Sequence, residues 1–325
     1  MRWLIGIVLA FALGWTGYWF AGATAIRRGA TDFLAAQGAR AGHESLSVQG
    51  FPNRFDLTVT GPEFSDPVTG WRWSAPFAQV FAMTWKPWHL IGVMADSQEI
   101  EAAGQRIGVT SQDLRGSLVL HPGTDLALER LVLEGADLRA VSDRGWQIGA
   151  ATLAFATAED PTRRNTHRIG LQVDGLDLGP AMAIALPGLG GVIGRIHLDA
   201  HLLLTGAIDR HLGAVEVAAV EIGDLSLDWG SLQIRARGSL ARASEGFAEG
   251  VIELEIHQWR QVPAVLKALG LVPPGVADTY GKALELLAEQ GDDPDVLKVP
   301  LTMKGGRMSL GALPIGRAPR LAAPS

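Results

Sequence analysis

The sequence predicts a mainly β fold with minor α content: an amino-terminal transmembrane helix, then a strongly curved antiparallel sheet with a few short helices. Three observations carry this prediction. The run from Trp3 to Ile26 contains no charged residue. From Glu44 onward, apolar and polar residues alternate with the period of a strand. The 40 glycines and 17 prolines among 325 residues are typical of short strands and tight turns.

The uncharged run is long enough to cross a membrane. At ~1.5 Å per residue it reaches about 36 Å as a helix, against about 30 Å for a hydrocarbon core. Tyr18, Trp19 and Phe20 gather near its end, and aromatic side chains favour the headgroup level. The full apolar length favours a retained anchor. The small residues between Ala21 and Ala25 also fit the cleavage site of a secretory signal peptide, so that alternative stays open.

The orientation of the anchor does not follow from charge alone. Arg2 lies on one side of the run and Arg27 with Arg28 on the other, so the count of positive residues is nearly balanced. Long domains, however, are translocated largely regardless of nearby charge. We therefore expect a single-pass protein of the inner (cytoplasmic) membrane with the bulk of the chain in the periplasm.

The chain divides into four expected segments. Residues 1–26 form the anchor and 27–43 a short amphipathic helix, which either caps the following domain or lies as a collar on the membrane surface. Residues 44–316 form one β-rich domain with a helical insert at about 259–291, where the apolar spacing becomes helical. Residues 317–325 form a tail.

Several turns can be placed within the β-rich domain. Alternating residues on both sides of Gly50 to Asn53 predict a hairpin, and Gly305-Gly306 predicts another near the end of the chain. Asp160 to Thr166 is a polar break between two strands. The uncharged stretch from Leu178 to Gly194 is rich in glycine and contains two prolines, which predicts a loop with a short helix and not a second membrane span.

Composition excludes several classes of function. The formal net charge of −6 argues against a nucleic-acid partner, which would require clustered Lys and Arg. The chain has no cysteine, so thiol catalysis, thiolate metal sites and disulfides are excluded. No nucleophile elbow, zinc-protease motif or phosphate-binding loop occurs. We therefore expect neither an enzyme nor a bound cofactor.

Two groups of residues resemble metal ligands. His197, Asp199 and His201 share one face of an expected strand, which suits either a metal site or a solvated polar face. Alternate strand residues lie about 7 Å apart, and this spacing favours the solvated face. Asp292-Asp293 with Asp295 lacks the glycine and terminal glutamate of a calcium loop, which favours a solvated loop.

The strongest candidate site is apolar. Phe77, Phe81, Met83, Trp85 and Trp88 follow one another in a β context. They form either a sealed core or the lining of an apolar groove that holds acyl chains, since an open curved sheet has a concave face suited to lipid tails.

Three segments carry a family resemblance. Gly50-Phe-Pro-Asn-Arg-Phe-Asp56, Trp71-Arg-Trp-Ser-Ala-Pro76 and the closing stretch from Met308 to Gly316 resemble domain-of-unknown-function family 2125 (DUF2125). That family is similar to AsmA-like envelope proteins. The resemblance implies an anchored periplasmic β body, and larger relatives are similar to bridges that conduct phospholipid along an apolar groove. It supplies no catalytic residue, and the chain is much shorter than those bridges.

The expected function is therefore binding or transfer of membrane lipid, held by its acyl chains, in support of the envelope. The alternative is a non-enzymatic envelope scaffold that binds another envelope protein through an exposed strand edge and carries no lipid.

Overall fold

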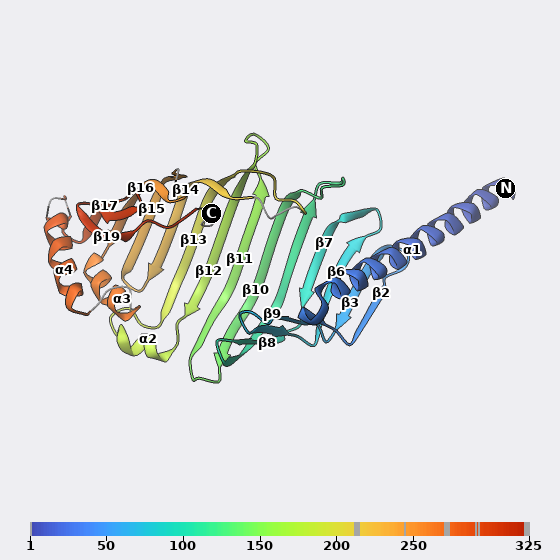
Figure 1. The fold of residues 1–325 in the computed structure, drawn as a ribbon, viewed down its shortest axis with the longest axis horizontal. Helices are drawn as coiled ribbons and strands as arrows, with labels where there is room; N and C mark the ends of the chain where they lie inside the picture. Colours follow the sequence, from blue (N-terminus) through green and yellow to red (C-terminus); the bar gives the residue numbers. More distant parts are fainter. Residues whose placement is uncertain are drawn as a thin grey trace. The chain divides into compact units, whose positions relative to one another are not determined.

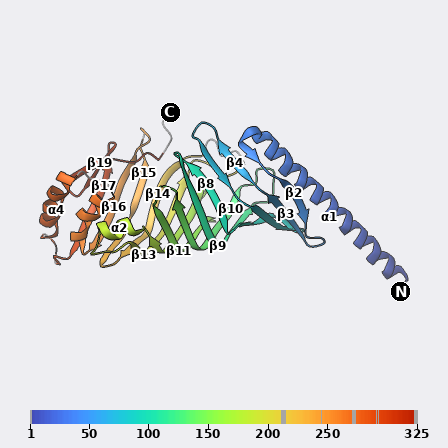
Figure 2. The same ribbon diagram turned by 90° about the horizontal axis from the view of Figure 1, so that it is seen from below.

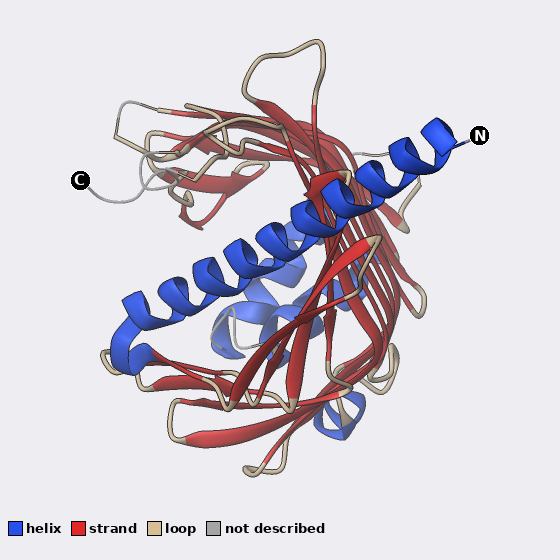
Figure 3. Cartoon of the chain, turned by 90° about the vertical axis from the view of Figure 1, so that its right-hand side faces the viewer, coloured by secondary structure: helices blue, strands red, loops and turns tan. Residues whose placement is uncertain are grey.

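A computed structural model describes residues 2–210, 215–243, 245–269, 274–289, 291 and 293–321. The chain forms two compact units. Unit 1 comprises Met1–Pro122 with Leu131–Trp146, and unit 2 comprises Gly123–Arg130 with Gln147–Ser325. Strands dominate both units, and α1 is the longest of the helices drawn (Figure 3).

The amino-terminal helix α1 runs unbroken from Arg2 to Gln37. It is long and apolar enough to cross a membrane. The separate amphipathic helix expected at 27–43 is instead the last part of α1, because no proline interrupts the helix after Ile26. The short helix η1 (Gly38–Arg40) follows at once, and Gly38 begins it with a positive φ of 56°. Leu34, in this last part of α1, is buried.

The strands of unit 1 are antiparallel and mostly short (Figure 1). In chain order they are β1 (Ala41–Gly42), β2 (Ser45–Gln49), β3 (Arg54–Thr60), β4 (Glu63–Asp66), β5 (Trp71–Ser74), β6 (Phe77–Met83), β7 (Lys86–Met94), β8 (Ser97–Ala102), β9 (Gln105–Leu120) and β10 (Leu128–Ser142), whose first three residues are assigned to unit 2.

Hydrogen bonding arranges the first eight strands in two rows. One row has the order β1-β4-β5-β8 and the other the order β2-β3-β6-β7. Both rows end on β9, where β8 pairs with the half that begins at Gln105 and β7 pairs with the half that ends at Val119. Each strand of one row thus continues into a strand of the other across a short break. Gly61-Pro62 and Ala75-Pro76 lie in two of these breaks, where proline cannot donate to the sheet.

Unit 2 is a meander in which each strand pairs with the next along the chain. Its strands are β11 (Gln147–Glu159), β12 (Thr166–Asp177), β13 (Val192–Leu204), β14 (Val217–Trp229), β15 (Leu232–Arg242), β16 (Ala248–His257), β17 (Val296–Lys304), β18 (Arg307–Leu310) and β19 (Leu313–Arg317). Helix α2 (Pro180–Ala185) lies in the glycine-rich loop after β12. The expected helical insert contains η3 (Trp259–Gln261), α3 (Val262–Ala268) and α4 (Pro274–Ala288).

The antiparallel sheet expected from the alternation is confirmed, as are its hairpins at Gly50–Asn53 and Gly305-Gly306. The strong curvature is not: the sheet is neither strongly curled nor closed. Register shifts, which bend strands locally, occur between β13 and β14 and between β14 and β15, whereas the pairing of β12 with β13 and that of β15 with β16 run without a shift.

The buried core of unit 2 lies where the helices cover one end of the strands. Trp229, Trp259, Leu284 and Leu297 belong to this cluster, and all are at most 3% exposed. The indole N–H of Trp259 donates to the backbone oxygen of Pro294 at 3.0 Å, which satisfies its one polar group inside an apolar cluster. The helical insert therefore closes one end of the sheet.

The core of unit 1 joins α1 to the first hairpin. Trp19 and Ala23 of α1 pack with the buried Phe55 of β3. The rings of Trp19 and Phe55 stack with centroids 6.0 Å apart. Gly22 lies directly over Phe55, where a Cβ atom would stand 2.6 Å from the ring. Helix and hairpin meet this closely only because residue 22 has no side chain.

We predict that Gly22→Ala destabilises unit 1 by about 1–3 kcal/mol, the usual cost of overpacking a tight contact. Phe55 cannot move away easily, since it is buried between the rings of Tyr18 and Trp19. Gly17→Ala is the matched control on the exposed side of α1, where a Cβ meets nothing within 4 Å. Thermal unfolding of the full chain in detergent measures both; equal melting temperatures would contradict the prediction.

Candidate lipid-binding surfaces

The five residues predicted to line a groove do not form one surface. Phe77, Phe81 and Met83 alternate along β6 and share one of its faces. Trp85 lies in the turn between β6 and β7 and is 59% exposed. Trp88 lies in β7 and is half-buried. The structure thus brings three of the five together.

The face that carries Phe77, Phe81 and Met83 is mixed and not apolar. Phe81 stands opposite Asp56 of β3, and the guanidinium of Arg54 lies 5.7 Å from the centre of its ring. Gln79, between the two phenylalanines, donates to the hydroxyl of Thr58 at 3.2 Å. This face offers an acyl chain only isolated apolar patches.

The opposite face of the same strands is continuously apolar. Cross-strand partners point to the same side of a sheet, so the register gives its members directly. They are Leu46, Val48, Phe55, Leu57, Val59, Ala78, Val80, Ala82, Leu90, Met94 and Leu118. Part of this face is covered by α1 through Phe55 and Val48. In β6 the large residues Phe77, Phe81 and Met83 lie on the mixed face, and the smaller residues between them lie on the apolar face.

Unit 2 carries a second apolar face, whose centre is partly exposed. Leu153 and Phe155 of β11 stand opposite Val173 and Leu171 of β12, and Leu171 stands opposite Leu198 of β13. With Ile169 these side chains form a patch that we call the apolar strip, made of Leu153, Phe155, Ile169, Leu171, Val173 and Leu198. All six are partly exposed, and none belongs to the buried clusters of the described residues.

The alternation of these strands is visible in the sequence, and it correctly separates an apolar from a polar face. Whether another element covers the apolar face cannot be read from alternation. The helices of the insert cover the end of the sheet near Trp229 and Leu297, and the apolar strip lies outside that cluster.

The polar face of these strands is held by ion pairs. Arg168 of β12 binds Asp199 of β13 through two hydrogen bonds of 2.8 and 2.7 Å, and this guanidinium lowers the pKa of Asp199. Arg195 donates to Asp174 at 2.9 Å. His197 lies 3.7 Å from Asp224.

The two groups that resemble metal ligands have other partners, in line with the solvated face and loop that the spacing favours. Asp199 is held by Arg168, and His201 faces Asp160 at 4.0 Å. Asp292 lies outside the described residues; Asp293 accepts a hydrogen bond from the backbone N–H of Asp295. Within the part of the chain that the structure describes, no three His, Asp or Glu side chains are grouped as metal ligands.

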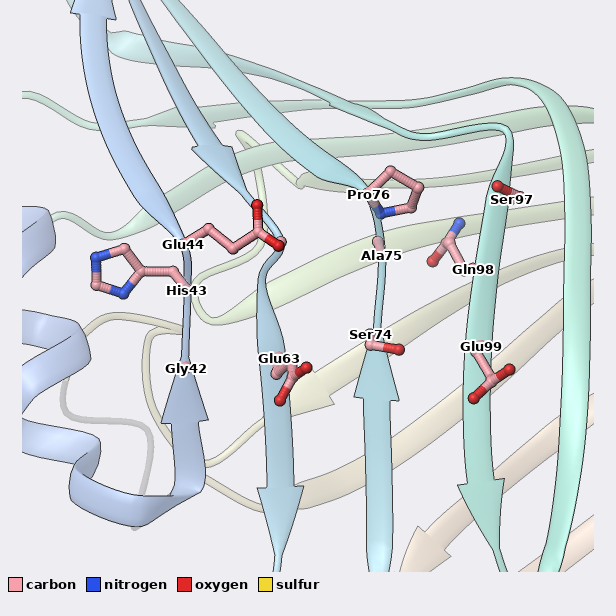
Figure 4. Close-up of a pocket in the computed structure, with 11 residues that line it drawn as sticks. Gly42, His43, Glu44, Glu63, Ser74, Ala75, Pro76, Ser97, Gln98 and Glu99 are labelled. Carbon is pink, nitrogen blue, oxygen red and sulfur yellow. The ribbon is translucent and has the colours of Figure 1, made fainter.

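A hollow of about 880 Å³ lies over the strand breaks of unit 1 (Figure 4). Glu44, Glu63 and Glu99 line it together with Ser74 and Gln98. Figure 4 shows these side chains on neighbouring strand segments, with Glu44 directed toward the adjacent segment. Three carboxylates with polar neighbours make this hollow unsuitable for acyl chains.

The polar break predicted at Asp160 to Thr166 forms a turn tied to the sheet. The carboxylate of Asp160 accepts hydrogen bonds from the hydroxyl and backbone N–H of Thr162 and from Arg163, and these bonds lower its pKa strongly. Arg163 also binds Glu221 of β14 at 2.8 Å.

We predict that Asp160→Asn lowers the melting temperature at pH 7 and that the difference from wild type shrinks as the pH falls below about 4. A carboxylate with a lowered native pKa stabilises the fold above its unfolded pKa of about 3.9, and this stabilisation is lost as the pH falls through the native value. Asp32→Asn, at an exposed position of α1, is the control. A difference between wild type and Asp160→Asn that stays constant from pH 7 to pH 3 would refute this assignment.

Comparison with known proteins gives one match. A family model described as "Uncharacterized protein conserved in bacteria (DUF2125)" matches residues 19–319. No curated protein matches the chain, and no solved structure does. The match includes the three segments from which the resemblance was inferred, whereas the likeness to AsmA-like proteins stays a prediction. The matched region covers the chain from the middle of α1 to beyond β19, and the chain therefore belongs to the DUF2125 family.

Proposed function

We propose that this protein is a single-pass membrane protein that binds lipid by its acyl chains, and that the apolar strip of unit 2 is the surface that holds them. The observation that carries the proposal is that the strip runs across β11, β12 and β13 without a polar interruption and that all six of its side chains stay partly exposed. Contiguous apolar patches that are open to solvent mark sites for apolar partners.

The chemistry of the strip suits an acyl chain. Its six side chains are hydrocarbon throughout and offer no hydrogen-bond donor or acceptor, so they provide affinity without directional recognition. Covering about 100 Å² of such surface is worth about 2.5 kcal/mol. The ion pairs of the opposite face keep the strands in the register that holds the strip together, as Arg168 does with Asp199.

Helix α1 supports the proposal through its length and its exposed apolar half. A span at the amino terminus would keep unit 1 and unit 2 beside a bilayer that supplies the lipid. We place the body of the protein in the periplasm, on the argument that a start-proximal anchor exports the domain that follows. The proposal involves no catalytic step and no cofactor.

The proposed surface differs from the one expected from the sequence. Phe77, Phe81 and Met83 lie on a mixed face beside Arg54 and Asp56, so they are not part of the proposed lining. Lipid is still the proposed ligand, and the apolar strip of unit 2 is the proposed binding surface.

We predict that the full chain extracted in mild detergent retains phospholipid in native mass spectrometry. Leu171→Glu should lower the retained lipid about tenfold or more, because it puts a charge at the centre of the strip. Ala154→Glu is the matched control, since it adds the same charge at an exposed position on the opposite face of the neighbouring strand β11. It also separates lipid held by the strip from lipid that merely surrounds α1.

Two results would refute the proposal. One is a wild-type mass without lipid, and the other is equal lipid retention in the two variants. A lipid-free protein that captures one envelope protein in stoichiometric crosslinks would establish the scaffold instead.

A further inference from the structure

Helix α1 has a free half and a bound half. From Trp3 to Leu13 its large apolar side chains are more than half exposed. From Trp15 onward the helix is attached to unit 1. Figures 1 and 2 show the free half of α1 extending beyond the strands of unit 1.

The attachment is made at two strand turns that lie side by side. One is the β2–β3 turn at residues 50–53 and the other the β6–β7 turn at residues 84–85, and we call them the tips. The backbone N–H of Thr84 donates to the backbone oxygen of Asn53 at 3.1 Å and joins the two tips.

Three aromatic side chains of α1 bind backbone oxygens at the tips or next to them. Trp15 donates to Pro52 at 3.0 Å, Tyr18 to Thr84 at 2.6 Å, and Trp19 to Arg54 at 2.7 Å. All three donors lie within about one helical turn, and the three bonds therefore fix the position of the tips along the axis of α1.

The length of the free half is too small for a membrane span. From Arg2 to Gly14 the helix rises about 20 Å at ~1.5 Å per residue, whereas a hydrocarbon core measures about 30 Å. Tilting the helix only shortens its reach across the bilayer. The missing ~10 Å corresponds to about seven further residues of α1. Those residues begin at Trp15, the first that is bonded to a tip.

The tips have the side chains that a bilayer surface favours. Phe51 is 52% exposed and Trp85 is 59% exposed, although both are large and apolar. Phe51 packs on Trp19 and Phe20 of α1, with ring centroids 5.5 and 6.2 Å apart. Aromatic side chains concentrate at the level of the headgroups.

The polar groups of the tips suit the same place. Backbone oxygens are costly in lipid unless they are hydrogen-bonded, and α1 satisfies those of Pro52 and Thr84 with its own side chains. Arg54 and Lys86 directly follow the two tips along the chain, where the lipid phosphates would lie.

From these contacts we infer that the two tips are embedded in the surface of the bilayer that α1 spans, with Phe51 and Trp85 among its lipids. Unit 1 then contacts the membrane surface directly through the two tips, in addition to its covalent link to the spanning part of α1. This inference rests on the span assigned to α1 in the proposed function. It does not depend on lipid binding by unit 2. It gives Trp85 a role at the bilayer surface and not in a groove.

The absence of cysteine allows a direct test by single labels. The full chain carries Leu9→Cys, Phe51→Cys, Trp85→Cys or Val68→Cys, each with a fluorophore sensitive to its environment. Leu9 and Val68 are 58% and 85% exposed, and Val68 lies in the β4–β5 turn, away from the tips. Each protein is reconstituted in phosphatidylcholine–phosphatidylglycerol vesicles with or without phosphatidylcholine brominated on its acyl chains.

We predict that brominated lipid quenches the labels at positions 9, 51 and 85 at least twofold and leaves position 68 unchanged. If position 9 is quenched but positions 51 and 85 are quenched no more than position 68, the inference about the tips is wrong and the membrane span of α1 still holds. No quenching at 9 overturns the span and the inference together. Two tip positions on separate turns keep the test decisive if one variant fails to fold.

Discussion

The register of antiparallel pairing is the constraint on which the other features of this protein depend. Each cross-strand pair puts its two side chains on the same face, so Leu153 with Val173 and Leu171 with Leu198 build one apolar surface. A slip of one residue would move every one of them to the opposite face, among Arg168 and Asp199. The ion pairs on the polar face and the apolar contacts on the other favour the same register.

The contact between α1 and the first hairpin depends on the same alternation. Phe55 faces α1 because Arg54 and Asp56, its neighbours in β3, face the other side and bind each other at 2.8 Å. Gly22 then lets the helix approach the ring closely enough for Trp19 and Tyr18 to reach backbone oxygens near the tips. These contacts hold α1 and the first hairpin to each other. On the span proposed for α1, the same packing sets the height of unit 1 above the bilayer.

Much of the fold could be predicted because it follows from local periodicity. The hairpin around Gly50–Asn53, the turn at Gly305-Gly306 and the short helix in the loop before Gly194 are all specified by neighbours in the chain. The glycine content predicts short strands, whereas several strands are long. Gly108 lies within β9 and Gly170 within β12, where cross-strand pairing continues on both sides of the glycine.

The neighbours of the candidate groove residues could not be predicted from the sequence. The aromatic residues Phe77 and Phe81 have the size and polarity of a lipid-binding surface, yet Arg54 and Asp56 lie beside them. That neighbourhood depends on the pairing of β3 with β6, which residues far apart in the chain decide together.

The sequence by itself determined the apolar length of α1, the β class, the two-faced strands and the absence of thiol chemistry. Each of these is a property of composition or of residue spacing along one segment. The tertiary structure alone decided which apolar face is covered. It buried the face beside Trp229 and Trp259 under the helical insert and left the strip around Leu171 half-exposed. It also attached Trp15, Tyr18 and Trp19 to the tips. Burial and contact between distant segments follow from packing in three dimensions, and no periodicity along the chain encodes them.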